Sequence, residues 1–366
     1  MNKTAALFVE AVSKYSSIVI YIPGSPDPDA IASAYVIKVI LKYHLIESDI
    51  ITEKSLSLPQ NQAFINRLKI PVIFGKDINL EKYNAYIVPD FQSNRIEYIG
   101  DSIPCAAHLD HHGESTNSVK ADFSLIRTDA GSTSTLVALI LKNLDIAFSE
   151  KDLTAMATAL TFGLQTDTDK YNHITSLDLE ALGFLLEFTD KSILQEISSM
   201  PISPETFLYY NKAKGNEVVY KDWAFYGIGY IDAKNRDSIA ITADMILEKT
   251  DHNTVAVFAV IEDHNKGEMY LDVSLRTKSN TVDLNKFIKQ ITSNGGGRRY
   301  KGAYQVELSY FLDTPDRDML WNAIESTTLE TLRKSRDALY AAGIKDIYDS
   351  VKHKIISFLK KDRGFR

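Results

Sequence analysis

Short apolar, β-branched stretches alternate with longer helical patterns through the first half of the chain, and this alternation constrains the fold more than any other feature. Because strands separated by helices are joined by crossover connections, the pattern predicts an α/β fold with a mainly parallel sheet flanked by helices. Ligands bind beyond the carboxyl ends of the strands in such sheets, so the residues that follow each strand are the first candidates for a functional site. The predicted strands and helices span residues 17–22, 30–45, 85–88, 103–109, 132–144 and 153–164.

The chain of 366 residues is long enough for two domains with separate cores. The pattern loosens in residues 191–215, where two prolines interrupt a polar stretch, and we predict a linker there. Residues 1–190 then form the first domain and residues 216–312 a smaller α+β domain. Residues 313–366 read as a helical extension, with a break near Gly343.

The charge balance and the cysteine content exclude some classes of protein. With 41 basic and 48 acidic residues, the net charge of -7 argues against a broad basic face for duplex DNA, so an anionic substrate must be met by a local pocket. The single cysteine, Cys105, cannot form an internal disulfide and is expected as a buried strand residue in a reducing compartment. No stretch approaches the roughly 18 apolar residues of a membrane span. We therefore expect a cytoplasmic protein without a membrane partner.

Two carboxylates follow the first predicted strand. Asp27 and Asp29 flank Pro28 between the strand 17–22 and the helix that runs on from Ala30. Asp29 lies where a helix N-cap belongs, and capping is the usual role of a lone Asp at such a position. Two Asp residues around a proline are harder to explain by capping alone, and carboxylate oxygens suit Mg²⁺ and Mn²⁺.

The other predicted strands end in similar residues. Asp90 follows the strand 85–88, and the strand 103–109 continues into Asp110, His111 and His112. A lone Asp or His would normally be a turn or packing residue, but several at one edge of a sheet indicate a metal site. The mixed carboxylate and imidazole set matches Mn²⁺ better than zinc, and two ions could stabilise an in-line phosphoryl displacement. The candidate metal ligands are Asp27, Asp29, Asp90, His111 and Asp167.

These residues resemble the motifs of the DHH/DHHA1 phosphoesterases, within the RecJ-like superfamily. Residues 26–30 resemble the first motif, Asp90 the second, residues 110–112 the third and residues 166–168 the fourth. The resemblance extends over about residues 15–312. Within this family, the sequence is similar to the subfamily of bacterial oligoribonucleases, pAp phosphatases, and cyclic-di-AMP and pApA phosphodiesterases.

The resemblance implies a role for each motif residue. Asp27 and Asp90 would hold one ion, and Asp90 would bridge it to a second. His112 would lie near the substrate or support the ligand shell, so the expected catalytic residues are Asp90, His111 and His112. The second ion would be held by Asp29, Asp90, His111 and Asp167.

The first motif departs from the family pattern at Pro23. The family normally has a histidine there that ligates the first ion, and proline cannot bind a metal. We therefore predict weaker binding of the first ion, or a replacement ligand from elsewhere. The ligand set of the second ion is complete.

The second domain resembles the DHHA1 substrate-binding module through residues 273–276 and the glycines that follow. Arg298 stands where the family usually has a histidine, and Arg299 and Lys301 add positive charge. Glycines let the backbone approach a phosphate closely, and guanidinium groups bind a phosphate through pairs of hydrogen bonds. These residues therefore suggest a phosphate-binding pocket, and the alternative is a solvated basic turn. Arg276 is expected to contact the substrate, and the alternative is a surface salt bridge. The candidate substrate-binding residues are Arg276, Gly295, Gly296, Gly297, Arg298 and Arg299.

The resemblance implies a metal-dependent phosphodiesterase that uses Mn²⁺, with Mg²⁺ or Co²⁺ as alternatives. Its substrate would be a small nucleotide, such as cyclic-di-AMP or pApA, or a short single-stranded RNA. A pyrophosphatase or exopolyphosphatase remains open, as does a catalytically impaired relative that binds nucleotides. The apolar face of the C-terminal helices could pack on the chain itself or on a second subunit, which leaves a homodimer open.

Overall fold

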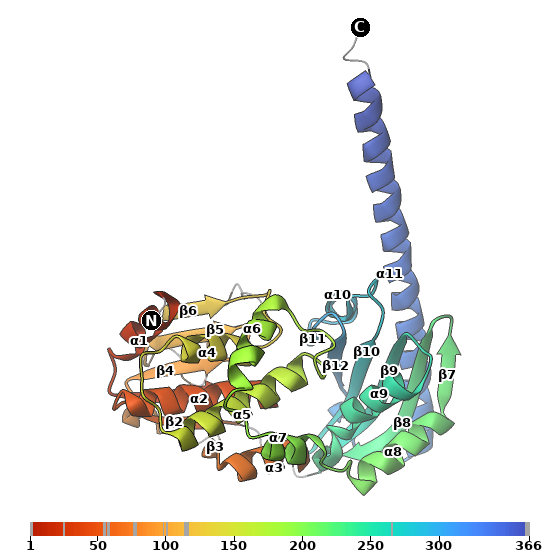
Figure 1. The fold of residues 1–366 in the computed structure, drawn as a ribbon. Coiled ribbons are helices and arrows are strands. Elements are labelled where there is room, and N and C mark those ends of the chain that lie inside the picture. The colour runs from red at the N-terminus through yellow and green to blue at the C-terminus, as the bar shows by residue number, and fades with distance from the viewer. Residues whose placement is uncertain are drawn as a thin grey trace. The chain divides into compact units, whose positions relative to one another are not determined.

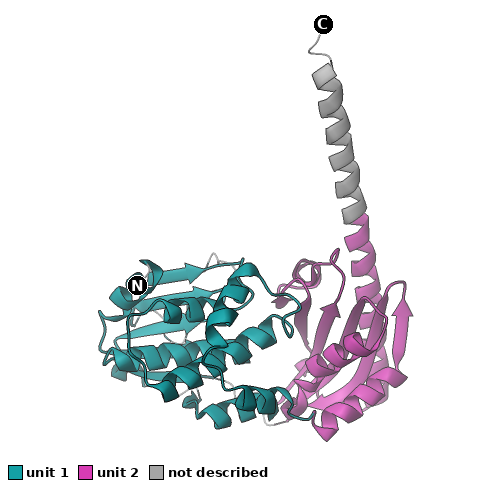
Figure 2. Ribbon diagram, in the orientation of Figure 1, with its two compact units in different colours: residues 1–201 teal, residues 202–366 magenta. Residues whose placement is uncertain are grey.

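The computed structural model describes residues 3–362, except 25, 54–55, 57–58, 76–78, 98, 100–101, 113–116 and 265, and it describes side chains only up to residue 341. The chain divides into two compact units, Met1–Pro201 and Ile202–Arg366 (Figure 2). Each unit is built around its own six-stranded sheet (Figure 1). The fold is therefore mixed α/β, as the sequence predicts.

The first unit holds a parallel sheet with the strand order β3-β2-β1-β4-β5-β6. The direction of winding reverses between β1 and β4, and such a switch point is where ligands bind in sheets of this kind. The strands are β1 (Ser17–Ile22), β2 (Glu47–Thr52), β3 (Val72–Phe74), β4 (Ala85–Pro89), β5 (Cys105–Asp110) and β6 (Ala121–Ile126). The helices are α1 (Lys3–Val12), α2 (Pro28–Tyr43), α3 (Pro59–Leu68), α4 (Thr133–Lys142), α5 (Glu150–Asp167), α6 (Ser176–Leu185) and α7 (Lys191–Ser198), with a 3₁₀ turn η1 (Leu80–Lys82).

Strand β1 is buried on both faces of the sheet. Its side chains alternate between a large core under the helices, which receives Ile18 and Ile20, and a smaller core on the opposite face, which receives Val19 and Tyr21. This explains why β1 is a continuous apolar run. Strands β2, β3 and β6 were not predicted, because each is short or partly polar and has side chains that are exposed or only half-buried.

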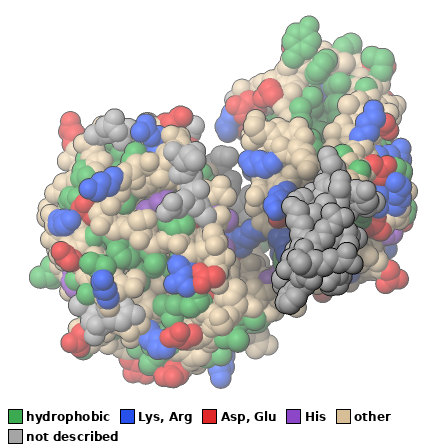
Figure 3. Space-filling model, turned by 90° about the horizontal axis from the view of Figure 1, so that it is seen from above, with side chains coloured by type: hydrophobic (Ala, Val, Ile, Leu, Met, Phe, Trp, Pro, Cys, Tyr) green, Lys and Arg blue, Asp and Glu red, His purple; other side chains and the backbone are tan. Residues whose placement is uncertain are grey.

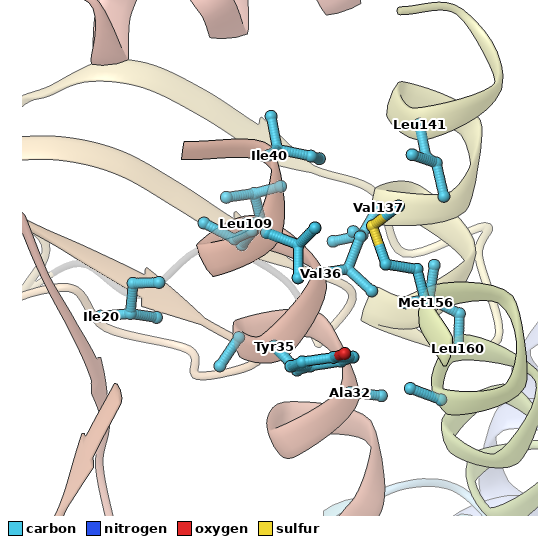
Figure 4. Packing of buried hydrophobic residues seen from close by; sticks show 14 of the residues in the cluster. Ile20, Ala32, Tyr35, Val36, Ile40, Leu109, Val137, Leu141, Met156 and Leu160 are labelled. Atoms are coloured by element: carbon cyan, nitrogen blue, oxygen red, sulfur yellow. The ribbon is translucent and has the colours of Figure 1, made fainter. Parts of the chain in front are cut away.

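Helices α2, α4 and α5 pack against one another above the sheet. Val36 of α2 lies toward Val137 of α4, and both approach Met156 and Leu160 of α5 (Figure 4). All four side chains are buried, and each such burial stabilises the fold by roughly 1.5–3 kcal/mol. This packing fixes the ends of α2, α4 and α5 relative to β1.

Residues 191–215, which were predicted to form a linker, are largely helical. Helix α7 places Ile197 in the core of the first unit, whereas α8 (Pro204–Gly215) places Tyr210 in a core of the second. Pro204 does not interrupt a helix but begins one, next to the N-cap Ser203, because the first turn of a helix needs no N–H from that position.

The second unit holds a mixed sheet with the order β11-β12-β10-β9-β8-β7, in which β8 and β9 are parallel and the other pairs antiparallel. Separate cores form under α8 and α9 and under α10 and α11. Helix α11 runs through Gly343 without the predicted break. The strands are β7 (Glu217–Tyr220), β8 (Trp223–Asp232), β9 (Thr254–Asp263), β10 (Glu268–Thr277), β11 (Gly295–Gly297) and β12 (Lys301–Glu307). The helices are α8, α9 (Ser238–Lys249), α10 (Leu284–Ile291) and α11 (Arg317–Asp362), with 3₁₀ turns η2 (Ala233–Asn235) and η3 (Ser309–Phe311).

Charged side chains of both signs are interspersed on the face of the molecule seen in Figure 3. Within the described part of the chain, no helix has the length and hydropathy that crossing a bilayer requires.

Candidate metal centre

The candidate ligands of the first unit come from the carboxyl ends of β1, β4 and β5 and from the last residue of α5. Asp27 is the N-cap of α2, and its Oδ1 accepts the N–H of Ala30 at 2.9 Å. The expectation that Asp29 lies at the N-cap was therefore wrong by two residues. Helix α2 begins at Pro28, where proline is favourable, so Asp29 lies within the first turn and its side chain serves another purpose.

Asp29 is fully buried and accepts hydrogen bonds from the start of helix α4. Its Oδ2 accepts the N–H of Thr133 and its Oδ1 that of Ser134, both at 2.7 Å. Burial raises the pKa of Asp29 well above its ordinary value, and the charges of Asp90 and Asp167 raise it further. A bound cation would offset this accumulation of negative charge.

Asp90 follows β4 in a left-handed backbone conformation, with φ of +55°. A residue other than glycine rarely adopts this region, and such strain is concentrated at functional sites. The N–H of Asp90 donates to the carbonyl of Leu109 at 2.8 Å, and its Oδ1 accepts the hydroxyl proton of Thr133 at 2.9 Å. Both the backbone and the carboxylate of Asp90 are thus held in place.

His111 faces three carboxylates. Its Nδ1 lies 3.2 Å from the carbonyl oxygen of Ala130, which can only accept a proton, so the neutral ring carries its lone pair on Nε2. This Nε2 lies 3.2 Å from Asp167 Oδ2, 3.5 Å from Asp90 Oδ1 and 4.0 Å from Asp29 Oδ2. One ligand atom from each of these four residues lies within 4.8 Å of all the others. The structure thus brings together the residues that the resemblance assigns to the second ion.

His112 forms a second group with Asp90 and His111, whose candidate ligand atoms also lie within 4.8 Å of one another. Its Nδ1 donates to Asp110 Oδ1 at 2.8 Å and lies 3.7 Å from Asp90 Oδ1. Burial raises the pKa of Asp110, but the hydrogen bond and the charge of His112 outweigh it, so this pKa lies below its usual value. Sequence reasoning gave Asp110 no role of its own, although its place within the motif was a signal.

Asp27 belongs to neither ligand group found among the described residues. It is nevertheless close enough to Asp29 for its charge to raise the pKa of that carboxyl. The four residues around His111 fit a hard divalent cation, since they combine three carboxylates with one imidazole. The structure supplies no comparable group around Asp27 among the residues it describes.

Gly163 of α5 is a site residue that sequence reasoning missed. A Cβ at this position would lie 2.3 Å from Ser134 Oγ and 3.1 Å from the Cα of Asp29. Only glycine therefore lets α5 approach the helix starts that carry Asp29 and Ser134. A glycine inside a helical pattern was the available signal, because it weakens a helix and needs a packing reason.

The predicted substrate residue Arg276 lies in the second unit and is buried. Its Nε lies 2.6 Å and its Nη2 3.2 Å from the two carboxylate oxygens of Asp244, and its Nη1 donates to the carbonyl of Leu275 at 2.9 Å. The guanidinium group is thus bound by its own unit in this structure. A substrate phosphate would have to compete with Asp244.

The predicted glycine motif forms the hairpin of β11 and β12. Gly297 has φ of +154°, and a Cβ there would lie 2.3 Å from the carbonyl oxygen of Lys301. The N–H of Arg298 donates to the same carbonyl at 2.7 Å, while the Arg299 guanidinium donates to the carbonyl of Asn280. Packing of the hairpin explains Gly297, so its role in binding phosphate stays a prediction.

Comparison with known proteins identifies the family. Residues 17–164 match the N-terminal domain of the DHH family, and residues 224–309 match the DHHA1 domain. The chain is a DHH/DHHA1 protein. The DHH family is metal-dependent, and the cluster of Asp and His side chains in the first unit could bind a metal.

Two similar proteins extend the comparison. An uncharacterised protein of Methanocaldococcus jannaschii is 31% identical to this DHH/DHHA1 protein over 327 residues, which are 88% of this chain but 63% of that protein. The chain thus spans less than two thirds of that relative. The crystal structure of an exopolyphosphatase-related protein from Bacteroides fragilis aligns with a TM-score of 0.68 at 18% identity, over 93% of this chain and 100% of the other. The two proteins share a fold.

Proposed function

We propose that this DHH/DHHA1 protein is a Mn²⁺-dependent phosphodiesterase that hydrolyses small nucleotides, such as cyclic-di-AMP, pApA or a short oligoribonucleotide. The observation that most supports the proposal is the approach of His111 Nε2 to the carboxylates of Asp29, Asp90 and Asp167. Oxygen ligands combined with one imidazole favour Mn²⁺ over zinc, and Mg²⁺ and Co²⁺ are the ions to compare with it.

The protein contributes ligands whose orientation is fixed before any substrate binds. A divalent cation held by these residues supplies the charge that acidifies a water molecule and stabilises the phosphoryl oxygens during an in-line displacement. The carboxylate of Asp29 is oriented by two backbone N–H groups, and that of Asp90 by the hydroxyl of Thr133. The imidazole of His111 is oriented by the carbonyl of Ala130. Such outer hydrogen bonds are typical of metal ligands.

His112 is our candidate for handling a proton or a phosphate oxygen. Its Nδ1–H is bound by the carboxylate of Asp110, which fixes the orientation of the ring and its tautomer. The second ring nitrogen, Nε2, is then the atom that can give or accept a proton. In this role, replacing His112 would lower turnover without changing the affinity for the second ion, because His112 is outside the ligand group of that ion.

We propose that the first ion binds more weakly than the second. Pro23 supplies no ligand, and the Oδ1 of Asp27 already caps helix α2. Asp90 and His111 both belong to the two ligand groups, and of these Asp90 is better suited to bridge two ions because its carboxylate has two oxygens. Calorimetric titration with Mn²⁺ tests this, since two sites of equal affinity would contradict it.

The second unit would bind the phosphate groups of the substrate through Arg298 and Arg299. Arg299 is exposed and Arg298 half-buried, and both follow the glycines of the β11–β12 hairpin. Replacing both arginines with alanine should raise KM with little change in kcat or in Mn²⁺ affinity. Lys266→Ala, in the hairpin between β9 and β10, is the matched control because it removes a charge elsewhere in the same unit. An unchanged KM in the double variant would contradict this role.

One hydrolysis panel separates the proposed substrates from the alternatives. Cyclic-di-AMP, pApA, pAp, short RNA, pyrophosphate and polyphosphate would each be tested with Mn²⁺, Mg²⁺ and Co²⁺. Turnover of the nucleotides, competed by nucleotides and not by polyphosphate, is the expected result. Turnover of pyrophosphate or polyphosphate alone would favour the second candidate function, a pyrophosphatase or exopolyphosphatase. The positive charges within residues 298–301 support this candidate. Tight nucleotide binding without hydrolysis would indicate an impaired relative.

A further inference from the structure

Residues 130–135, which enter helix α4, contact the candidate ligands that come from the strand ends. The carbonyl of Ala130 accepts the Nδ1 proton of His111 at 3.2 Å. The hydroxyl of Thr133 donates to Asp90 Oδ1 at 2.9 Å. Two ligands from two different strands thus take their orientation from a single short segment.

The same segment also binds the third of these ligands. The backbone N–H groups of Thr133 and Ser134 donate to the two oxygens of Asp29, both at 2.7 Å. A shift of the segment would therefore move or release three ligand side chains together. What holds residues 130–135 in place consequently determines whether the ligand atoms converge.

Asp178 of helix α6 holds this segment through Gly131 and Thr135, which are not the residues that contact the ligands. Its carboxylate oxygens lie 2.9 and 3.1 Å from the backbone nitrogen of Gly131. Its Oδ1 also accepts the hydroxyl proton of Thr135 at 2.6 Å. Asp178 and Thr135 are fully buried, so the hydrogen bond between them forms away from water, where such bonds are stronger.

The fit between Asp178 and the segment is close. A Cβ at Gly131 would lie 2.3 Å from Asp178 Oδ2, so a residue with a side chain could not occupy this position without displacing the carboxylate. The N-cap residue of α4, Ser132, accepts the N–H of Thr135 at 3.0 Å, which couples Thr135 to the start of the helix. Asp178 therefore restrains both ends of the turn.

Capping of α6 does not account for these contacts. In the capping box of α6, Asp178 Oδ2 accepts the N–H of Thr175 at 2.7 Å, and the Thr175 hydroxyl accepts the N–H of Asp178 at 3.3 Å. That box is complete without Gly131 or Thr135. The carboxylate of Asp178 thus has a second set of partners, all in the segment that orients the ligands.

We propose that Asp178 is a positioning residue of the metal centre, which acts through residues 130–135 to make Asp29, Asp90 and His111 converge. This inference rests on the proposed metal-dependent function. Asp178→Asn would replace an accepting oxygen by an NH₂ group that faces N–H and O–H donors, so the segment would move. Loss of a group that bonds directly to a metal ligand typically weakens metal binding by about 10–100-fold, and a shift of residues 130–135 would disturb several such groups at once.

The variants separate positioning from stability. Asp178→Asn removes an acceptor for the segment, and Thr135→Val removes the hydroxyl while keeping the shape of the side chain. Thr135→Ser keeps the hydroxyl and should retain the wild-type affinity. Thr175→Ala is the matched control, because it removes the hydroxyl that caps α6 but leaves the bonds from Asp178 to the segment.

The test is the affinity of the full chain for Mn²⁺ by calorimetry, together with the visible absorption spectrum of the Co²⁺-loaded protein and the Tm of each variant. Asp178→Asn and Thr135→Val should bind Mn²⁺ about 10–100-fold more weakly and change the Co²⁺ spectrum. Thr175→Ala should lower Tm and leave affinity and spectrum unchanged.

Two other outcomes have distinct meanings. If Asp178→Asn and Thr135→Val bind Mn²⁺ as tightly as the wild type, the positioning role is wrong. If the wild type itself binds no divalent ion, the proposed metal centre is wrong and this inference is lost with it. If Asp178→Asn does not fold, the comparison of Thr135→Val with Thr135→Ser still decides the matter, since equal affinities of these two variants would overturn the proposal.

Discussion

The Nε2 atom of His111 lies 3.2 Å from Asp167 Oδ2, although one residue follows a strand and the other ends a helix. This contact joins the ligands of the sheet edge to the carboxyl end of helix α5. Neither side chain is exposed, so little water is available to screen the negative charge that a bound ion would neutralise. A cation between them would relieve the repulsion among the three carboxylates.

Asp167→Asn should weaken Mn²⁺ binding at least tenfold, because it removes a carboxylate from the ligand group around His111. Isothermal calorimetry of the purified protein measures the effect. Asp152→Asn, at the other end of the same helix, is the control, since Asp152 pairs with Lys42 and not with the site. Equal losses of affinity in both variants would show that Asp167 acts only through the stability of α5.

Asp90→Asn should abolish hydrolysis while the metal-free protein remains at least as stable as the wild type. Asn tolerates the left-handed conformation that Asp90 adopts, so the backbone is not strained further. The substitution also removes a buried negative charge that raises the pKa of Asp29. Thermal unfolding in the presence of a chelator, compared with turnover in Mn²⁺, tests both parts. A large fall in Tm without metal would contradict this explanation.

Gly163→Ala should destabilise the first unit by about 1–3 kcal/mol and weaken metal binding, because its Cβ would overlap Ser134 Oγ. Gly183→Ala in helix α6 is the matched control, because nothing lies within 4 Å of a Cβ there. That variant should gain about 0.5–1 kcal/mol, as expected for Gly→Ala inside a helix. Chemical denaturation measures both, and a stabilising Gly163→Ala would refute the close approach of α5.

Cys105 should resist alkylation at neutral pH until the protein unfolds. Burial in strand β5 raises the pKa of its thiol to about 12, so the reactive thiolate is scarce below that pH. Mass spectrometry after treatment with iodoacetamide, in buffer and in denaturant, tests this. Rapid labelling of the native protein at pH 7 would contradict the burial of Cys105.

The strand-end ligands were predictable from sequence because each side chain follows an apolar run directly. Asp90 and His111 stand immediately after β4 and β5, and parallel strands bring such residues to one edge. The contribution of residues 130–135 was not predictable in this way. These residues contact Asp29 and His111 through backbone N–H and C=O groups. Nearly every residue type has these groups, so the sequence does not reveal the contacts.

Local signals also misled where tertiary packing decided the outcome. Pro204 was expected to interrupt a helical stretch but begins helix α8, and Asp29 suggested a cap of its own helix but binds the start of α4. The guanidinium group of Arg276 is bound by Asp244, and the contact of Arg276 with substrate stays a prediction. The identity of the metal and the substrate, a cytoplasmic location, the lack of a duplex DNA partner and a homodimer stay predictions.

The most direct test of the account is to measure Mn²⁺ stoichiometry and hydrolysis of pApA together, on the wild type and on His111→Asn. His252→Asn, which changes a histidine of the second unit paired with Glu217, serves as the control. We expect His111→Asn to lose the tightly bound ion and, with it, hydrolysis, while the control retains both. Hydrolysis at the wild-type rate by His111→Asn without that ion would contradict this expectation.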